Sequence, residues 1–236
     1  MSTVTMFKLI SDVATRRAPP KLLAYGTLNF LNRWFRTGNR RFEFERLYAE
    51  HGDIWNFSTS EYEHTKYAKT LDLALKHCPK LDRALEVGCG TGVFSGLLAQ
   101  HFRIVVATDI SGEVLRIAAV ANRSVTNIQF LREDFRRLTA NARFDLVVCA
   151  EVLYYLRETD SKAVCQALDR LLGSRGVILT VSGIPQSGAA NSGSGYFNGW
   201  NETFSRRFTF VESMDVTDTG RPYRIAAFRH NDNGSA

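Results

Sequence analysis

Ala84-Leu85-Glu86-Val87-Gly88-Cys89-Gly90-Thr91-Gly92 is the stretch that decides the fold. A short apolar run ends here in glycines at every second position, and an amphipathic run begins at Val93. This pattern predicts a strand, a tight turn and a helix. Glycine has no Cβ, so the backbone can approach a ligand closely and adopt φ > 0. Because the helix that follows directs its free N–H groups and positive dipole end at this loop, we expect a carboxylate or phosphate group to bind here.

The composition is typical of a globular domain. With 236 residues and 44% hydrophobic content, the chain can bury one substantial core, so one domain with an N-terminal addition is expected. No apolar run reaches the roughly 18 residues that a membrane-spanning helix needs. Met1 to Ile10 lack the apolar region and cleavage site of a secretory signal, which favours a cytoplasmic protein.

The cysteines indicate neither a disulfide framework nor a zinc site. Their spacing is not that of metal ligands, and two of them fall at the ends of expected core strands. The four are Cys78, Cys89, Cys149 and Cys165. We therefore expect reduced thiols and no bound metal.

Most of the positive charge lies near the N-terminus. Residues 1–50 carry nine basic side chains against four acidic ones, which accounts for nearly all of the net charge of +6. In residues 19–41 these charges flank leucine and aromatic side chains, a pattern typical of a basic amphipathic helix that begins after Pro19-Pro20. Such a segment either makes peripheral contact with an anionic membrane or packs on the main domain with its arginines in water. Basic and aromatic residues are not interleaved elsewhere, so nucleic acid is not expected as a partner.

Residues 42–77 are predicted to form a helix, an irregular connection and a second helix. The connection is unusually aromatic and contains Trp55, and Ser60 has capping-box spacing with the glutamate three residues later. On the second helix Tyr62 and Lys66 are four residues apart and share a face. These side chains either close the open side of the core, with Lys66 solvated, or form a lid over a bound cofactor, with Lys66 supplying a cation.

Apolar runs separated by helix-length segments follow the glycine turn. Strands are expected at 104–109, 128–132, 144–150 and 177–182, helices at 113–121 and 161–172, and after a possible helix at 196–206 two further strands at 209–216 and 223–230. Strands that are apolar on both faces predict a parallel sheet covered on both sides. The short connection with Gly and Pro between the last two strands predicts a hairpin. The expected fold class is therefore α/β, a Rossmann-like open sheet of about seven strands, mostly parallel with a C-terminal antiparallel hairpin and helices on both faces.

In an open α/β sheet the ligand binds at the carboxyl ends of the strands. The acids expected at these ends are Glu86, Asp109, Asp134 and Glu151. Asp109 follows Gly88 by 21 residues, an interval at which an acid can accept both hydroxyls of a ribose. Its structural alternative is to cap the next helix together with Ser111. The corresponding alternatives are a loop acid for Asp134 and a helix-start carboxylate for Glu151.

The glycine spacing argues against a dinucleotide. The fingerprint G-x-G-x-x-G/A needs a small residue where this chain has Val93, and the third glycine arrives one place early, at Gly92. This spacing is wrong for a pyrophosphate binder.

The stretch Glu86 to Gly92 resembles the E-x-G-x-G-x-G signature of class I S-adenosylmethionine-dependent methyltransferases, whose strand order also ends in an antiparallel hairpin. The resemblance spans about residues 83–182 and implies S-adenosyl-L-methionine as the cofactor, S-adenosyl-L-homocysteine as the product and no metal. It implies that the glycine loop meets the methionine part of the cofactor, Asp109 the ribose and Asp134-Phe135 the adenine. With the lid side chains, the expected cofactor-binding set is Glu86, Gly88, Cys89, Gly90, Gly92, Asp109, Ile110, Asp134, Phe135, Glu151, Trp55, Tyr62 and Lys66.

A narrower resemblance is carried by residues 55–67, by Ser111 and by Glu151-Val152-Leu153-Tyr154-Tyr155-Leu156, which are similar to the nodulation protein S group. That group methylates the free amine of a chitooligosaccharide. It implies N-methylation of a small molecule or (oligo)saccharide. This chain departs from the group by its basic N-terminal segment and by residues 184–195, so O-methylation of a small hydroxylated metabolite or lipid, and a regulatory protein that binds the cofactor without transfer, are the alternatives.

Glu151, Tyr154 and Tyr155 are the expected catalytic residues. Glu151 ends the fourth strand and the tyrosines follow one turn later, so Glu151 is expected to accept a hydrogen bond from the acceptor and Tyr155 to orient it. Plain packing is the alternative for both tyrosines. The chain thus divides into an extension (1–41), a methyltransferase domain (42–231) with N-terminal lid helices (42–77), and a tail (232–236). We expect a monomer or dimer.

Overall fold

The computed structural model describes residues 40–184 and 195–231. Seven strands form one sheet in the order β3-β2-β1-β4-β5-β7-β6. The strands are β1 (Arg83–Val87), β2 (Ile104–Asp109), β3 (Ile128–Arg132), β4 (Phe144–Ala150), β5 (Leu172–Gly183), β6 (Phe208–Val216) and β7 (Tyr223–His230). The helices are α3 (Arg40–His51), α4 (Glu61–His77), α5 (Val93–Leu98), α6 (Gly112–Ala121), α7 (Ser161–Leu171) and α8 (Gly195–Arg207), with short 3₁₀ turns η1 (Leu153–Tyr155) and η2 (Glu158–Asp160).

The sheet is mostly parallel. Strand β1 pairs in parallel with both β2 and β4, while β7 inserts antiparallel between β5 and β6. The chain therefore leaves β1 toward one edge, returns to β4 beside β1, and reverses direction only in the final hairpin. The predicted fold class is confirmed, including the antiparallel end of the sheet.

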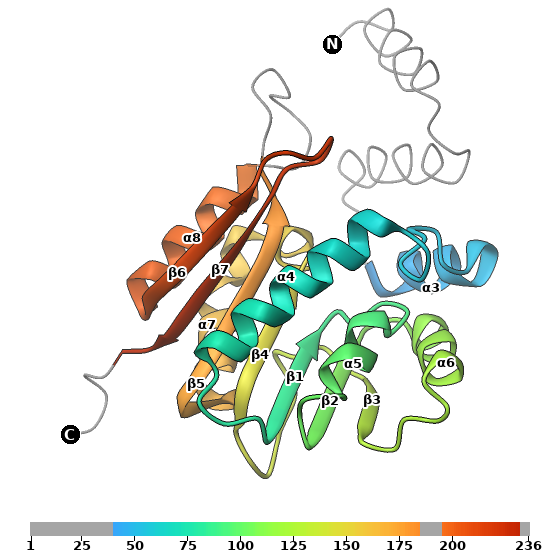
Figure 1. Cartoon of the computed structure of the whole chain (residues 1–236), viewed down its shortest axis with the longest axis horizontal. Helices are drawn as coiled ribbons and strands as arrows, with labels where there is room; N and C mark the ends of the chain where they lie inside the picture. Colours follow the sequence, from blue (N-terminus) through green and yellow to red (C-terminus); the bar gives the residue numbers. More distant parts are fainter. Residues whose placement is uncertain (1–39, 185–194, 232–236) are drawn as a thin grey trace, which may run out of the picture.

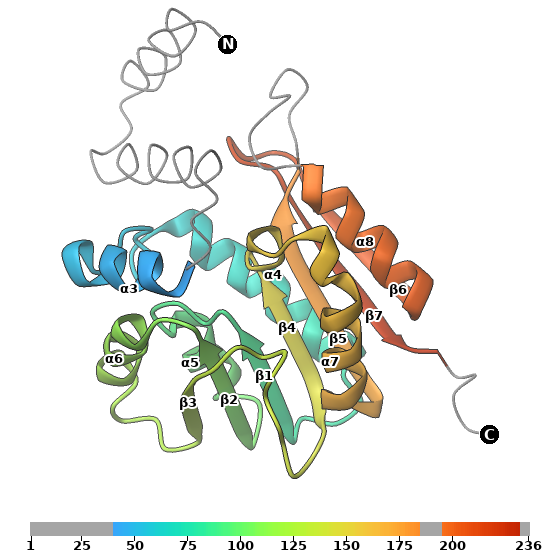
Figure 2. The same cartoon turned by 180° about the vertical axis from the view of Figure 1, so that it is seen from behind.

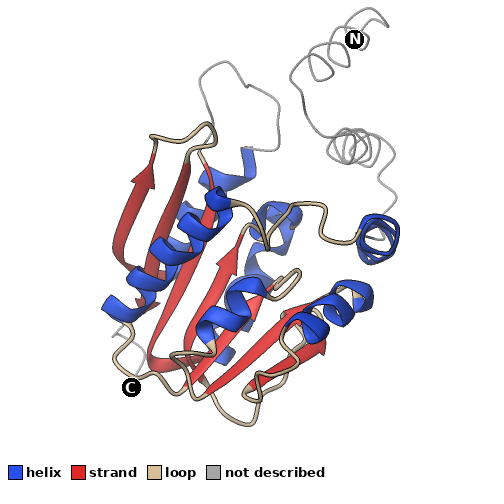
Figure 3. Cartoon of the chain, turned by 45° about the vertical axis from the view of Figure 1, so that its right-hand side comes forward, coloured by secondary structure: helices blue, strands red, loops and turns tan. Residues whose placement is uncertain are grey.

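Helices cover both faces of the sheet, as the blue and red elements of Figure 3 show. Helices α4 and α5 lie over one face, in front of the strands in Figure 1, and their apolar side chains pack with Leu146, Val148 and Leu179. Helices α7 and α8 lie over the other face, in front in Figure 2, and pack with Val147 and Ile178. Adjacent residues of β4 and β5 thus enter different cores, because successive side chains of a strand point to opposite faces.

Strand β5 starts five residues before the predicted Val177. Leu172 already pairs with Phe144 of β4, and the register shifts between Phe144 and Leu146. A Cβ on Gly176 would lie 2.8 Å from the Phe144 carbonyl oxygen, so the close approach of the two backbones requires glycine. The segment Gly173-Ser174-Arg175-Gly176 has the composition of a turn, and it forms the irregular part of β5 between the pairings of Leu172 and Val177 with β4.

Some of the predictions fall outside the described residues. They are the extension up to residue 39, most of the 184–195 connection, and the 232–236 tail. Within 40–184 and 195–231, no helix has the length and apolar character needed to cross a membrane.

Candidate functional site

The glycine loop joins β1 to α5 in a conformation that only glycine adopts easily. Gly88, Gly90 and Gly92 have φ values of +70°, +54° and +76°. The amides of Gly88 and Cys89 donate to the Thr108 carbonyl at 2.8 and 3.0 Å, so β2 anchors the start of the loop. The Gly92 amide donates to the Cys89 carbonyl at 3.0 Å, so a backbone hydrogen bond within the loop closes the turn.

Each of the three glycines also faces a close neighbour. A Cβ on Gly88 would lie 2.7 Å from Val152 Cγ2, and one on Gly92 would lie 2.9 Å from both Ala118 Cβ and Asn122 Nδ2. Gly90 differs, because its Cβ would be 3.3 Å from the Phe57 ring that follows α3. Gly88 and Gly92 thus pack the loop into the domain, whereas Gly90 faces the segment predicted as a lid.

Two side chains near this loop were not predicted from the sequence. Asn122, which follows α6, donates from Nδ2 to the carbonyls of Gly92 (3.1 Å) and Ala118 (2.9 Å). Glu45 of α3 accepts from the Gly112 amide at 2.7 Å and pairs with Arg132 at 3.3 Å. An asparagine after a helix is a C-cap signal, but neither partner could be read from sequence spacing. Through these contacts Glu45 connects α3 to the start of α6. Helix α3 lies beside α6 in Figures 1 and 2.

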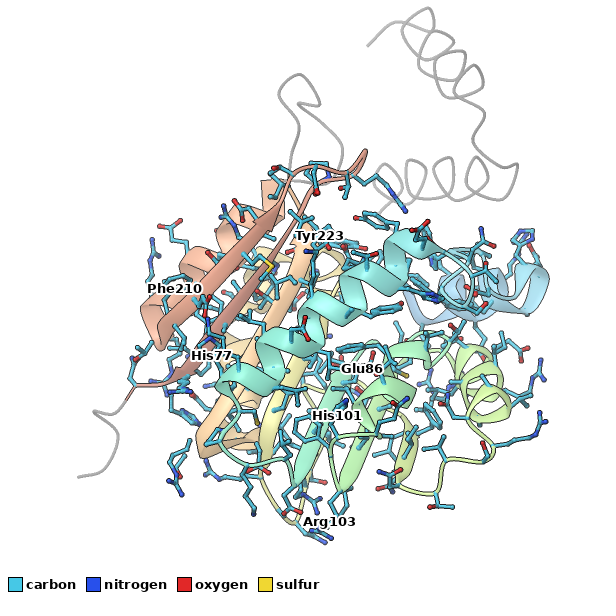
Figure 4. The ribbon with its side chains drawn as sticks, viewed as in Figure 1. His77, Glu86, His101, Arg103, Phe210 and Tyr223 are labelled. Atoms are coloured by element: carbon cyan, nitrogen blue, oxygen red, sulfur yellow. The ribbon has the colours of Figure 1, made fainter. Side chains whose placement is uncertain are left out.

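Glu86 is buried in the interior (Figure 4) and is bound to Ser95. The Ser95 hydroxyl donates to Glu86 Oε2 at 2.5 Å. Burial raises the pKa of Glu86 to about 8, and nearby Asp109 adds to this rise. Through Ser95, Glu86 therefore connects the end of β1 to α5, on the two sides of the glycine loop. Cys89, also on the predicted list, is buried as well, and burial raises its thiol pKa well above the usual range, so it is not a reactive thiolate.

Asp109, at the end of β2, faces the glycine loop. Its Oδ2 accepts from the Gly90 amide at 3.2 Å, and its Oδ1 accepts from the Ser111 amide at 2.9 Å. Ser111, not Asp109, is the N-cap of α6, since its hydroxyl accepts from the Val114 amide at 3.2 Å. Burial raises the pKa of Asp109 to about 6, although the amide hydrogen bonds oppose this rise. The carboxylate is thus held beside the loop, next to half-buried Ile110.

Asp134 and Phe135, which follow β3, have different surroundings. The Asp134 carboxylate accepts from Arg136 through Nε at 3.0 Å and Nη2 at 2.6 Å, and the pair keeps the pKa of Asp134 below its usual range. Arg136 also pairs with Asp160 at 3.2 Å. Phe135 is buried in the core beneath α7. The acid is therefore preorganised by an arginine, and the aromatic ring contributes to packing.

A charged cluster joins α4 to the end of β4. Lys66 Nζ lies 2.8 Å from Glu63 Oε2 and 3.3 Å from Glu151 Oε1. Only 4% of Lys66 and 5% of Glu63 are exposed. Ser60 caps α4 as predicted, since its hydroxyl accepts from the Glu63 amide at 3.4 Å, but the Glu63 side chain turns to Lys66 instead of completing a capping box. Glu63 is a further residue that sequence reasoning missed.

The Tyr62 side chain closes this cluster toward the hairpin. Its ring meets the Tyr223 ring edge-on at 5.7 Å, near the start of β7 (Figure 4), and its hydroxyl donates to the Arg221 carbonyl at 2.8 Å. The Lys66 ammonium lies 5.0 Å from the Tyr62 ring centroid. Trp55, the other aromatic lid candidate, lies half-buried in the preceding connection, 6.5 Å from the Phe57 ring that faces Gly90.

Glu151 has an unusual backbone. Its φ of +52° is one of two positive values among the described non-glycine residues, the other being Asn56. Its amide donates to the Val181 carbonyl at 2.8 Å, so β5 holds the strained turn in place. Such strain costs on the order of 1–3 kcal/mol and is concentrated at functional sites. The Glu151 carboxylate at this turn lies 3.3 Å from the Lys66 ammonium.

The two tyrosines after Glu151 lie in η1. The rings of Tyr154 and Tyr155 are 4.4 Å apart, and their hydroxyls are 3.5 Å apart. Phe44 of α3 meets the Tyr155 ring edge-on at 5.0 Å. Tyr154 also hydrogen-bonds to the Glu151 side chain. Glu151 and the two tyrosines therefore lie together, and Phe44 packs α3 against Tyr155.

Metal ligation has no support in the described ranges. No group of three or more His, Cys, Asp or Glu side chains there is placed to hold a metal ion. The site combines a glycine loop, a carboxylate beside it and a charged cluster at the next strand end. This arrangement suits a ligand with a nucleoside part and a nearby reacting centre.

Several curated relatives are named nodulation protein S. Nodulation protein S of Bradyrhizobium diazoefficiens is 32% identical over 106 residues, which is 45% of this chain and 50% of that protein. Nodulation protein S of Azorhizobium caulinodans is 27% identical over 143 residues, covering 59% of this chain and 66% of that protein. The chain thus spans about half the length of several curated relatives that it matches.

Solved structures share the fold. The N-methyltransferase NodS from Bradyrhizobium japonicum WM9, in complex with S-adenosyl-L-homocysteine, superposes with a TM-score of 0.71 at 20% identity, over 81% of this chain and 99% of that one. The fold is therefore the Rossmann-like fold of methyltransferases. The family model described as Nodulation protein S (NodS) matches residues 42–187, well over half of the chain. The protein therefore belongs to the nodulation protein S family.

Proposed function

We propose that the protein is an S-adenosyl-L-methionine-dependent N-methyltransferase that methylates an amine of a small molecule or (oligo)saccharide. One observation carries this proposal: the Asp109 carboxylate lies 3.2 Å from the Gly90 amide, at the junction of a glycine loop and the second strand. The relatives named nodulation protein S and the solved NodS N-methyltransferase support it.

The residues present fit this cofactor. Gly90 leaves open the space that a Cβ would fill between the loop and Phe57. The Thr91 hydroxyl is buried and has no hydrogen-bond partner among the described residues, so a bound polar group can satisfy it. Asp109 supplies two carboxylate oxygens for ribose hydroxyls. Asp134 would accept from the adenine amino group, and Tyr62 and Trp55 would close the methionine side, whereas the Lys66 ammonium is already paired with Glu63 and Glu151.

The bound cofactor supplies a methyl group made electrophilic by its sulfonium. The chain then has to hold the acceptor nitrogen in line and remove its proton, and alignment alone can supply on the order of 7–11 kcal/mol. Glu151 would take the proton from the amine, since burial raises its pKa toward the range of a useful base. Tyr154 and Tyr155 would orient the acceptor beside it. A general base adds roughly 10²–10⁴ in rate.

Mass spectrometry of candidate acceptors tests the proposal. The full chain is incubated with S-adenosyl-L-methionine and, separately, with amino sugars, oligosaccharides with a free amine, and small phenols. We expect a gain of one methyl group on an amine. Methylation of hydroxyl groups alone would show that the protein is an O-methyltransferase. Cofactor binding without any methyl transfer would indicate a regulatory protein.

Two variants test the catalytic assignment. Glu151→Gln and Tyr155→Phe should lower kcat for the amine acceptor, with Glu151→Gln the more severe, by about 10²-fold or more. Glu158→Gln is the matched control, because Glu158 is exposed and lies in the adjacent η2 turn. Near-normal turnover of Glu151→Gln would remove Glu151 from the mechanism.

A further inference from the structure

Two carboxylates share one buried ammonium at the end of β4. Lys66 Nζ lies 2.8 Å from Glu63 and 3.3 Å from Glu151, which is 85 residues from Lys66 in the sequence. Glu63 and Lys66 are three residues apart on α4, so the helix itself fixes their pairing. The Glu63 carboxylate therefore balances the Lys66 charge, independently of Glu151.

The surroundings of Lys66 allow it little freedom. Its ammonium faces the Tyr62 ring at 5.0 Å and the Tyr223 ring at 6.0 Å. The Thr70 hydroxyl donates to the Lys66 carbonyl at 2.7 Å within α4. Since aromatic rings exclude water and attract cations, the ammonium is held where charge interactions are strong.

The arginine that joins the cluster contributes less. Arg221 lies 3.8 Å from Glu63 Oε1, and 64% of its side chain is exposed, so water screens its charge. The cluster thus holds two carboxylates and one ammonium, of which Glu63 and Lys66 are buried and the Glu151 side chain is 29% exposed. Their formal sum of one negative charge is an environment that favours a cationic amine over an anionic acceptor.

We propose that Glu63 and Lys66 are positioning residues that act on the reaction through Glu151, with Lys66 holding the Glu151 carboxylate ionised and aimed and Glu63 limiting how strongly it does so. The proposal rests on the proposed function, in which Glu151 faces the acceptor. It adds a selection for amine acceptors that enter as cations and lose a proton to Glu151.

The two residues have opposite effects on Glu151. Burial raises the pKa of Glu151, while Lys66 lowers it by charge and by hydrogen bonding. Glu63 raises it as a like charge, and the hydrogen bond from Tyr154 in η1 lowers it. The remaining charged or titratable groups in the cluster are Tyr62 on α4, and Arg221 and Tyr223 on the hairpin. Lys66 and Glu63 therefore change the pKa of Glu151 in opposite directions.

The test titrates Glu151 directly in the cofactor-free full chain. Glutamate side chains are labelled with ¹³C at the carboxyl carbon, and the Glu151 signal is assigned by its loss in Glu151→Gln. Lys66→Met should move the Glu151 midpoint to higher pH, because the cation is gone. Glu63→Gln should move it to lower pH, because a like charge is gone and Lys66 is freed.

Matched controls lie on the same helix. Glu61→Gln and Lys69→Met change the same residue types at positions outside the cluster and should leave the midpoint unchanged. Each single variant leaves a buried charge unpaired and can destabilise the protein. The double variant Glu63→Gln/Lys66→Met removes both charges of the pair, and the Glu151 midpoint in it should lie between those of the two single variants. A Glu151 midpoint that is the same in Lys66→Met, Glu63→Gln and the controls would overturn the proposal.

The pH profile of methyl transfer separates this proposal from the proposed function. The acid limb of kcat/KM should shift up in Lys66→Met and down in Glu63→Gln, with smaller changes in the affinity for the cofactor. If the Glu151 midpoint shifts in opposite directions in Lys66→Met and Glu63→Gln but no amine is methylated, the roles of Lys66 and Glu63 are supported and the proposed N-methyltransferase function is refuted. Transfer with an unmoved acid limb in both variants would uphold the function and refute the cluster.

Discussion

Adding one methyl group at Gly92 should destabilise the folded protein by about 2–5 kcal/mol. Gly92 has a φ of +76°, and a side chain in this region costs about 1–2 kcal/mol. The new Cβ would also lie 2.9 Å from Ala118 Cβ and Asn122 Nδ2 and 3.2 Å from the Phe130 ring. Overpacking of this kind costs about 1–3 kcal/mol.

Two other glycines separate these contributions. Gly52 has a φ of +62° but nothing within 4 Å of the Cβ position, so Gly52→Ala should lose only the conformational part. Gly199, in α8, also has open space and no positive φ. Gly199→Ala should be neutral or stabilise by up to about 1 kcal/mol, because alanine favours helix.

Urea unfolding followed by circular dichroism measures all three variants without any cofactor. We expect the midpoint Cm to fall most for Gly92→Ala, less for Gly52→Ala and not at all for Gly199→Ala, with similar m-values. If Gly92→Ala is no less stable than Gly52→Ala, the loop does not pack against α6 as described.

Three further predictions concern the same loop. Asn122→Ala should cost about 1–3 kcal/mol in urea unfolding and weaken cofactor binding, because the Gly92 carbonyl loses its 3.1 Å hydrogen bond; normal affinity would show that Asn122 does not position the loop. Affinity for S-adenosyl-L-methionine should fall about tenfold per pH unit below about 6, where Asp109 becomes protonated, and calorimetry of Asp109→Asn should show weaker binding with a flatter pH dependence. Glu86 has a pKa raised from 4.5 to about 8, so its contribution to stability is complete below pH 4.5 and is lost as the pH rises through 8. Between these limits the free energy of unfolding of the wild type should fall by up to about 5 kcal/mol relative to that of Glu86→Gln. Parallel curves of stability against pH for the two proteins would contradict this.

The strands and the hairpin could be predicted because their signals are local. The run at 144–150 is apolar except for Asp145, and the 217–222 connection contains Gly and Pro. The beginning of β5 could not be predicted. Gly173 and Gly176 have turn character in isolation, and only the close approach of the Phe144 carbonyl explains why glycines sit in a strand.

The conformation of the glycine loop could be predicted from the sequence better than the side-chain contacts around it. Glycine spacing and the interval to Asp109 identified the loop, since both are set by one β-α-β unit. The pairing of Lys66 with Glu63 and Glu151 depends on how α4 lies across the sheet (Figure 1), which no spacing encodes. Glu63 has the position of a capping residue, but its buried carboxylate pairs with the Lys66 ammonium instead.

Binding of S-adenosyl-L-methionine to the glycine loop is tested most directly by isothermal titration calorimetry of the wild type and of Gly90→Arg. Gly90 faces Phe57, with no backbone closer than that ring, so the arginine should fill the cofactor's place. The positive φ of +54° at this position costs about 1–2 kcal/mol of stability, which leaves the domain folded. We predict that the wild type binds and that Gly90→Arg, with an unchanged circular dichroism spectrum, does not. Normal binding by Gly90→Arg would contradict the assignment of this loop as the cofactor site.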